Sequence, residues 1–180
     1  MKLHDTPFLL PPGEAPSLAQ AAAVIVPFPY EGGVSYGLGT AEAPQAVLDA
    51  SQQLEFYDDV LDAEPFRVGL ATIAPPEVPA AADQMVDQLD GLVDELLQKK
   101  KFVIVLGGDH SVTNGYIKAL RRHHDTFGVI QLDAHADLRE SYNGSPLSHA
   151  CVMARIREFT HHTLQIGIRS MSAEEGALIK

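Results

Sequence analysis

The feature that most constrains the fold of this chain is an apolar run, residues 127–132, followed at once by clustered polar side chains. A short apolar run is typical of a buried strand, and Asp133, His135 and Asp137 follow it at alternating positions. While the chain stays extended, alternate side chains point to the same side. Carboxylate and imidazole ligands suit manganese, zinc, iron or nickel rather than a metal held by soft thiolates. The stretch therefore predicts a metal site at the end of a buried strand.

Strand-like and helix-like segments alternate along the chain, which predicts an α/β fold with a mainly parallel sheet and helices on both faces. Ligands in such sheets gather at the carboxyl ends of the strands. The expected strands cover residues 21–26, 66–71, 102–106, 127–132 and 162–169. The expected helices cover residues 40–54, 80–100, 110–124, 148–159 and 170–180.

Several local patterns refine this outline. Pro27 and Pro29 are expected to end the first strand, because proline cannot donate to the ladder. Thr40 is expected to cap the first helix. The third strand is almost continuously apolar and is expected to be buried on both faces. The glycine-rich segment 31–40 has no phosphate-loop pattern, and its glycines predict a tightly turning or flexible connection.

The length of 180 residues predicts one domain with a substantial core. Residues 1–20 are rich in proline and are expected to form an irregular arm on the surface or on a neighbouring subunit. Residues 21–180 are expected to belong to a single domain. No internal repeat stands out in the sequence.

Composition narrows the functional classes. The net charge of −11 argues against nucleic acid or an anionic membrane as partner and favours cationic ligands. The single cysteine excludes an intrachain disulfide and a cysteine-based zinc framework. There is no apolar run of membrane-spanning length, and residues 1–12 lack the features of a signal peptide. A cytoplasmic location is expected.

A second motif, Gly107–Ser111, follows the third expected strand. Gly107 and Gly108 allow a sharp turn there, and His110 is predicted to be a metal ligand because its strand is expected to neighbour the strand that precedes Asp133. Asp109 is interpreted as structural, either capping the following helix or supporting a neighbouring loop. His149, at the start of a later helix, is either a surface or capping residue or a proton shuttle beside the metal.

These motifs together resemble the ureohydrolase (arginase/agmatinase) family, and bacterial agmatinases in particular. The resemblance extends over residues 21–175 and is carried by Gly107–Ser111, Asp133–Asp137, Ser148–His149, Gln165–Arg169 and two N-terminal stretches, Pro27–Tyr36 and Gly39–Ala46.

The resemblance implies a three-layer α/β/α fold and a centre of two manganese ions that activate water for attack on a guanidinium carbon. By the same resemblance, His110 and Asp137 bind one manganese, His135 binds the other, and Asp133 bridges both. His149 relays a proton to the departing amine.

The substrate implied is a small cationic guanidino compound. Agmatine, hydrolysed to putrescine and urea in polyamine metabolism, comes first, and guanidinobutyrate, arginine and formimidoylglutamate are the alternatives. The loop of residues 138–147 is expected to hold the substrate tail, with Asn143 as the candidate contact. A homo-oligomer is expected.

One part of the family pattern has no counterpart before Lys180, namely a later Asp-x-Asp motif with two metal ligands and a still later glutamate. The chain is therefore expected to be the N-terminal part of the family domain, without its C-terminal strands and with an unpaired strand edge and exposed apolar faces. On that expectation it binds metal weakly and is inactive alone. The alternatives are a non-catalytic remnant that acts in oligomer or partner contacts, and a zinc-dependent deacetylase-like amidohydrolase of the same architecture.

Overall fold

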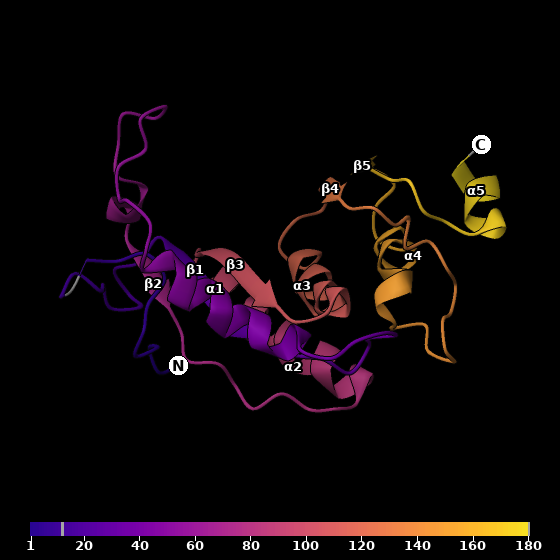
Figure 1. Ribbon diagram of the computed structural model, residues 1–180, viewed down its shortest axis with the longest axis horizontal. Helices are drawn as coiled ribbons and strands as arrows, with labels where there is room; N and C mark the ends of the chain where they lie inside the picture. The colour runs from indigo at the N-terminus through magenta and orange to yellow at the C-terminus, as the bar shows by residue number, and fades with distance from the viewer. Residues whose placement is uncertain (12, 180) are drawn as a thin grey trace.

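The computed structural model describes residues 1–11 and 13–179, and it has the expected α/β arrangement (Figure 1). Its strands are β1 (Ala23–Phe28), β2 (Leu70–Thr72), β3 (Phe102–Gly107), β4 (Val129–Leu132) and β5 (Thr163–Ile166). They pair in parallel in two sheets, in the orders β2-β1-β3 and β4-β5. The prediction of parallel strands is confirmed. The expected adjacency of β3 and β4 is wrong in the described residues, because the two strands belong to different sheets.

The α-helices are α1 (Ala43–Ser51), α2 (Ala82–Gln98), α3 (Thr113–Leu120), α4 (Val152–Ile156) and α5 (Ala173–Ile179). The described residues also form four short 3-10 turns, η1 (Thr40–Glu42), η2 (Pro65–Val68), η3 (His110–Val112) and η4 (His149–Cys151). The clearest helix prediction is confirmed in α2, whose apolar residues recur at helical spacing and are buried. Pro12 of the expected arm and Lys180 of the expected last helix lie outside the described residues. Among the described helices, none is long and apolar enough to cross a bilayer.

The main core lies around β1, the central strand of the first sheet. Every residue of β1 is buried, so both faces of this sheet are covered there. Val24, Val26 and Phe28 pack in one cluster with the apolar face of α2. Helix α1 contacts β1 and β3, and its Leu48, fully buried, lies outside that cluster. The prediction of helices on both faces is confirmed for this sheet.

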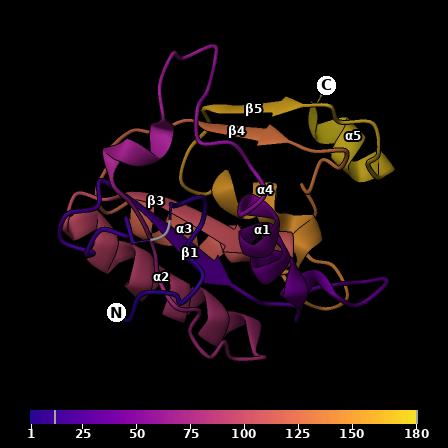
Figure 2. The same ribbon diagram turned by 60° about the vertical axis from the view of Figure 1, so that its left-hand side comes forward.

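A second core joins α3 and α4 to the segment after β4, with Ile117, Ala136, Val152 and Met153 among its buried members. Figure 2 shows β4 and β5 side by side, close to α4. Both strands also carry exposed apolar side chains: Ile130, Leu132, Leu164 and Ile166. Successive side chains of a strand alternate between its faces, so these four mark one open apolar face, as expected for this part of the chain.

Three expectations at the first sheet are wrong. Pro27 lies inside β1 and pairs with Leu106, and it is tolerated because β2 ends at Thr72, opposite Ile25, so that Pro27 has one neighbouring strand. Residues 66–68 form η2 instead of a strand, because Pro65 starts a turn and Gly69, at φ 85°, ends it. β3 is not buried on both faces, since Val103 is its only buried residue and Phe102 is 70% exposed.

The segments flanking β1 are held by side-chain contacts. Thr40 does not cap α1. Instead its backbone N–H donates to Glu31 Oε1 at 2.6 Å, and Gly39 precedes η1. The N-terminal arm lies against its own chain, where the N–H of Phe8 donates to Thr72 Oγ1 at 2.9 Å and Leu10 is buried. The arm therefore covers the β2 side of the sheet.

Candidate metal centre

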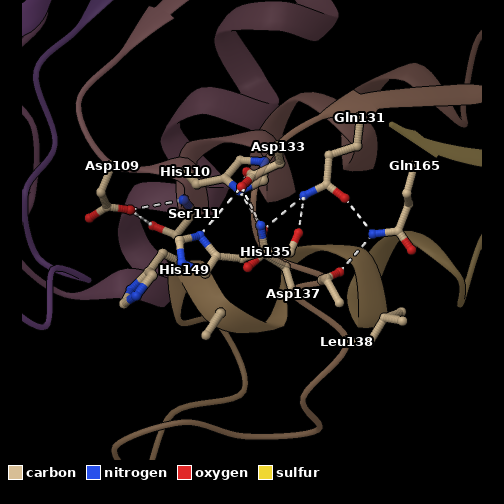
Figure 3. A network of polar contacts seen from close by, with 12 residues as sticks. Asp109, His110, Ser111, Gln131, Asp133, His135, Asp137, Leu138, His149 and Gln165 are labelled. Carbon is tan, nitrogen blue, oxygen red and sulfur yellow. Dashed lines mark hydrogen bonds and ion pairs between the residues drawn. The ribbon is translucent and has the colours of Figure 1, made fainter. Parts of the chain in front are cut away.

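Three of the predicted ligands, from segments that follow β3 and β4, meet at one point (Figure 3). His110 Nδ1 lies 3.0 Å from Asp137 Oδ2 and 3.7 Å from Asp133 Oδ2. One ligand atom of each residue lies within 4.8 Å of the others. β3 and β4 are not paired with each other. His110 nevertheless reaches the two aspartates, because it lies in the turn η3 that follows β3.

The donor set of this cluster fits a divalent cation of the manganese type. Two carboxylates and one imidazole offer hard oxygen and borderline nitrogen ligands. Asp137 is buried and Asp133 is half-buried, so two neighbouring negative charges lie away from bulk water, where a cation would offset their repulsion. Burial acts to raise the pKa of Asp133, but the backbone N–H of His135 and the charge of His110 outweigh it and hold that pKa below its ordinary value.

His135 lies near the other carboxylate oxygen of Asp133. Its Nδ1 is 3.4 Å from Asp133 Oδ1, and its backbone N–H donates to the same oxygen at 2.8 Å. Its side chain is 66% exposed and is not one of the three converging residues. Asp133 thus directs one oxygen towards each histidine.

Two glutamines support the cluster from the second sheet. Gln131, buried in β4, donates from Nε2 to Asp137 Oδ2 at 2.8 Å. Gln165 of β5 donates from Nε2 to Gln131 Oε1 and, at 2.7 Å, to the carbonyl of Ala136. These contacts fix the orientation of the Asp137 carboxylate. The sequence signal that could have indicated Gln131 is a polar residue inside an otherwise apolar strand.

The backbone at Asp137 is in the left-handed region, with φ 52°. Its carbonyl accepts the N–H groups of Met153 and Ala154 at 2.9 and 3.2 Å. The next N–H, that of Leu138, donates to Glu175 Oε1 at 2.9 Å. These bonds hold an unfavourable conformation that turns the Asp137 side chain towards His110. No pattern in the sequence indicates Glu175.

A cavity of about 280 Å³ lies beside the cluster and is lined by His135, Asp137 and His149, among others. His149 Nδ1 contacts the carbonyl oxygen of Gly33. Since a carbonyl oxygen can only accept, Nδ1 is the donor in this contact. The ring of Tyr142 lies edge-on to the imidazole at 5.8 Å.

Asp109 has both structural roles expected of it. Its Oδ1 accepts the N–H of Ser111 at 2.8 Å and caps η3, and its Oδ2 accepts the N–H of Gly33 at 2.7 Å. Asn143 lies at the exposed tip of the loop, in the left-handed region, and does not line the cavity. The structure therefore brings His110, Asp133, Asp137 and His149 to one region, with His135 beside them and Asn143 apart.

Parallel β-strands with a carboxylate and imidazole cluster at their carboxyl ends define an α/β protein with a candidate metal centre. The sequence model of the arginase family matches residues 21–180. The chain belongs to the arginase family, and the predicted family and fold are confirmed.

Similar proteins agree with this assignment. The chain is 42% identical over 171 residues to the N(1)-aminopropylagmatine ureohydrolase of Synechocystis sp., covering 91% of this chain and 56% of that protein. It is 33% identical to the agmatinase of Bacillus cereus, covering 89% of this chain and 56% of the relative. The solved agmatine ureohydrolase of Thermoplasma volcanium is 30% identical with a TM-score of 0.83, covering 88% of this chain and 54% of that structure. The chain spans about half the length of the curated relatives that it matches.

Proposed function

We propose that the protein containing this chain is a manganese-dependent hydrolase of a guanidino compound, with agmatine as the first candidate and putrescine and urea as products. The observation that carries the proposal is the convergence of His110, Asp133 and Asp137 within 4.8 Å, beside a cavity lined by His149. Family membership adds the reaction class, and the names of the relatives add the substrate class.

The described side chains would divide the binding of two ions between them. His110 and Asp137 would hold one manganese, His135 would hold the other, and Asp133 would be shared. The position of Asp133 supports this, because its Oδ2 lies 3.7 Å from His110 and its Oδ1 lies 3.4 Å from His135. When bound, the two ions would supply an activated water for attack on the guanidinium carbon.

His149 would transfer a proton to the departing amine. Its Nδ1 is occupied by the Gly33 carbonyl, so proton exchange falls to Nε2. The contact to Gly33 also fixes the ring beside the cavity, which keeps the donor in one orientation during the reaction.

The substrate proposal rests on charge and on the relatives. The chain has a net charge of −11, and Arg139, the cation that lines the cavity, lies 3.6 Å from the buried carboxylate of Glu175. That pairing leaves Arg139 less free to bind a carboxylated tail, which favours a tail without a carboxylate, as in agmatine. The 42% identity to an N(1)-aminopropylagmatine ureohydrolase makes N(1)-aminopropylagmatine the second candidate. Asn143 does not line the cavity, so its proposed contact would be with a part of the substrate tail that extends beyond the cavity.

The test is urea release by the whole protein that contains this chain, with added manganese, from agmatine, N(1)-aminopropylagmatine, arginine, guanidinobutyrate and formimidoylglutamate. Asp133→Asn is expected to abolish turnover and reduce bound manganese, whereas Asp125→Asn, at an exposed aspartate, is expected to change neither. Absence of turnover on all five substrates would contradict the proposal.

The number of bound manganese ions and the oligomeric state distinguish the proposed hydrolase from the non-catalytic alternative. Two manganese ions per chain in a homo-oligomer support a complete centre. None or one ion per chain, in a monomer or an aggregate, supports a remnant that acts only through contacts.

A further inference from the structure

One loop from the N-terminal half of the chain, residues 32–39, borders the cavity beside the candidate metal centre. Ser35 lines that cavity, and every other lining residue that the structure describes comes from residues 135–175. Two positions before Ser35, the carbonyl oxygen of Gly33 contacts His149 Nδ1. The loop therefore forms one side of the cavity.

The side chains at the tip of this loop are exposed. Tyr36 is 98% exposed and Leu38 is 87% exposed, so neither packs into the body of the protein. Open space also surrounds Gly37 and Gly39, where a Cβ atom would find no described neighbour within 4 Å. A loop without buried apolar contacts opens easily, so its position depends on its hydrogen bonds.

Two carboxylates hold the loop, one at each end. At its start, Asp109 Oδ2 accepts the N–H of Gly33 at 2.7 Å. At its end, Glu31 Oε1 accepts the N–H of Gly39, the N–H of Thr40 at 2.6 Å and the Thr40 hydroxyl at 3.1 Å. The bonds to Glu31 join the two ends of the loop and close it at its base.

The carboxylate of Glu31 is well suited to this task. Loss of water contact acts to raise the pKa of Glu31, but the hydrogen bonds from Gly39 and Thr40 outweigh it and hold that pKa below its ordinary value. Glu31 is therefore charged at neutral pH, and a hydrogen bond to a charged acceptor is roughly twice as strong as one between neutral groups.

We propose that this loop binds the tail of the substrate through the Ser35 hydroxyl, and that Glu31 is the positioning residue that keeps Ser35 at the cavity. The inference rests on the proposed hydrolase function, which puts the guanidinium end at the metal cluster and leaves the tail for the rest of the cavity wall. A hydroxyl oxygen can accept a hydrogen bond from the terminal ammonium of agmatine or from an amine of N(1)-aminopropylagmatine.

The two ends of the loop have separate expected effects on the kinetics. In Glu31→Ala the bond between Asp109 and Gly33 remains, so His149 keeps its contact. The affected quantity is then the binding of the tail, which contributes equally before and during the reaction and appears in KM instead of kcat.

The test is steady-state urea release from agmatine by the whole protein that contains this chain, with added manganese. Glu31→Ala and Ser35→Ala are each expected to raise KM about 3- to 10-fold and to change kcat less than about two-fold. Glu31→Gln keeps a carbonyl oxygen for the same N–H groups, so its KM is expected to lie between those of Glu31→Ala and the unmodified protein. Glu55→Ala, at an exposed glutamate, is the matched control and is expected to leave KM unchanged. Ser35→Ala removes only an exposed hydroxyl, so it stays informative if Glu31→Ala lowers stability.

Methylguanidine separates binding of the tail from binding of the guanidinium group, because it carries that group without a tail. Its inhibition constant against agmatine is expected to be the same in the unmodified protein, Glu31→Ala and Ser35→Ala. A rise in that constant equal to the rise in KM would show that the substitutions disturb the whole site, and it would overturn the proposal. Absence of urea release by the unmodified protein would overturn the hydrolase function and this inference together. Turnover with an unchanged KM in either variant would overturn this inference alone.

Discussion

The buried carboxylate of Glu175 accepts a hydrogen bond of 2.9 Å from the backbone N–H of Leu138, the residue after the candidate ligand Asp137. Its second oxygen accepts the N–H of Ser172 at 2.7 Å. Asp137 is in the left-handed region, which costs a non-glycine residue roughly 1–3 kcal/mol. Glu175 thus ties the start of α5 to the most strained residue of the candidate metal centre.

Replacing Glu175 by glutamine should weaken its hydrogen bonds to the backbone N–H groups of Leu138 and Ser172. One of the two backbone N–H groups would then face an amide NH₂ instead of an oxygen, so unfolding free energy should fall by about 1–3 kcal/mol. Manganese affinity should fall as well, because Asp137 would lose part of the support for its conformation. Urea denaturation and manganese titration by electron paramagnetic resonance measure the two effects. Glu174→Gln, at the exposed neighbour, is the control, and equal behaviour of both variants would contradict the role of Glu175.

His149→Ala tests the proposed proton transfer. Loss of a general acid or base typically lowers turnover about 100- to 10,000-fold. We expect kcat for urea release to fall within that range while bound manganese stays unchanged, because His149 is not one of the proposed ligands. His161→Ala, at an exposed histidine, should leave kcat as it is. A His149→Ala enzyme with unaltered kcat would remove His149 from the mechanism.

The candidate ligands could be predicted because their signal is local. Asp133, His135 and Asp137 follow a strand within five residues, and His110 follows two glycines at another strand tip. Adjacent strands do not explain the position of His110, since β3 and β4 are not neighbours. Their tips converge through the turn η3, which strand periodicity does not describe.

The supporting residues could not be predicted, because their contacts are distant in sequence and follow no period. Glu175 meets Leu138 across 37 positions, and Gln165 meets Gln131 across 34. The misplaced second strand has a different cause, because Pro65 and Gly69 impose turn geometry on a segment whose composition favours a strand.

The contact between α2 and the residues that follow α3 predicts a dependence of stability on pH. Asp94 Oδ1 lies 2.7 Å from His123 Nε2, and this hydrogen bond, opposed by partial burial and aided by the Arg122 charge, lowers the pKa of Asp94. A carboxyl whose pKa is lower in the folded state stabilises the fold above its unfolded pKa, and this contribution disappears as the pH falls through the folded value. The melting temperature of Asp94→Asn should therefore be below that of the unmodified chain at pH 7.

The difference should shrink as the pH falls below about 4, where carboxyl groups begin to take up protons. Thermal melts of both proteins between pH 2.5 and pH 7 measure it. Asp59→Asn, at an exposed loop position, should show no such trend. A difference that stays constant down to the lowest pH would contradict the assignment to Asp94.

Asp109 links the turn after β3 to the proposed proton donor. Its two oxygens accept the N–H groups of Ser111 and Gly33 at 2.8 and 2.7 Å, and the carbonyl of Gly33 contacts His149. Asp109→Asn places an amide NH₂ against one of these donors, so unfolding free energy should fall by about 1–3 kcal/mol. A displaced Gly33 should also misplace the imidazole and lower kcat with little change in KM. Chemical denaturation and steady-state kinetics test both effects, with Asp125→Asn as the control, and loss of stability without any loss of kcat would show that Asp109 supports the fold but not His149.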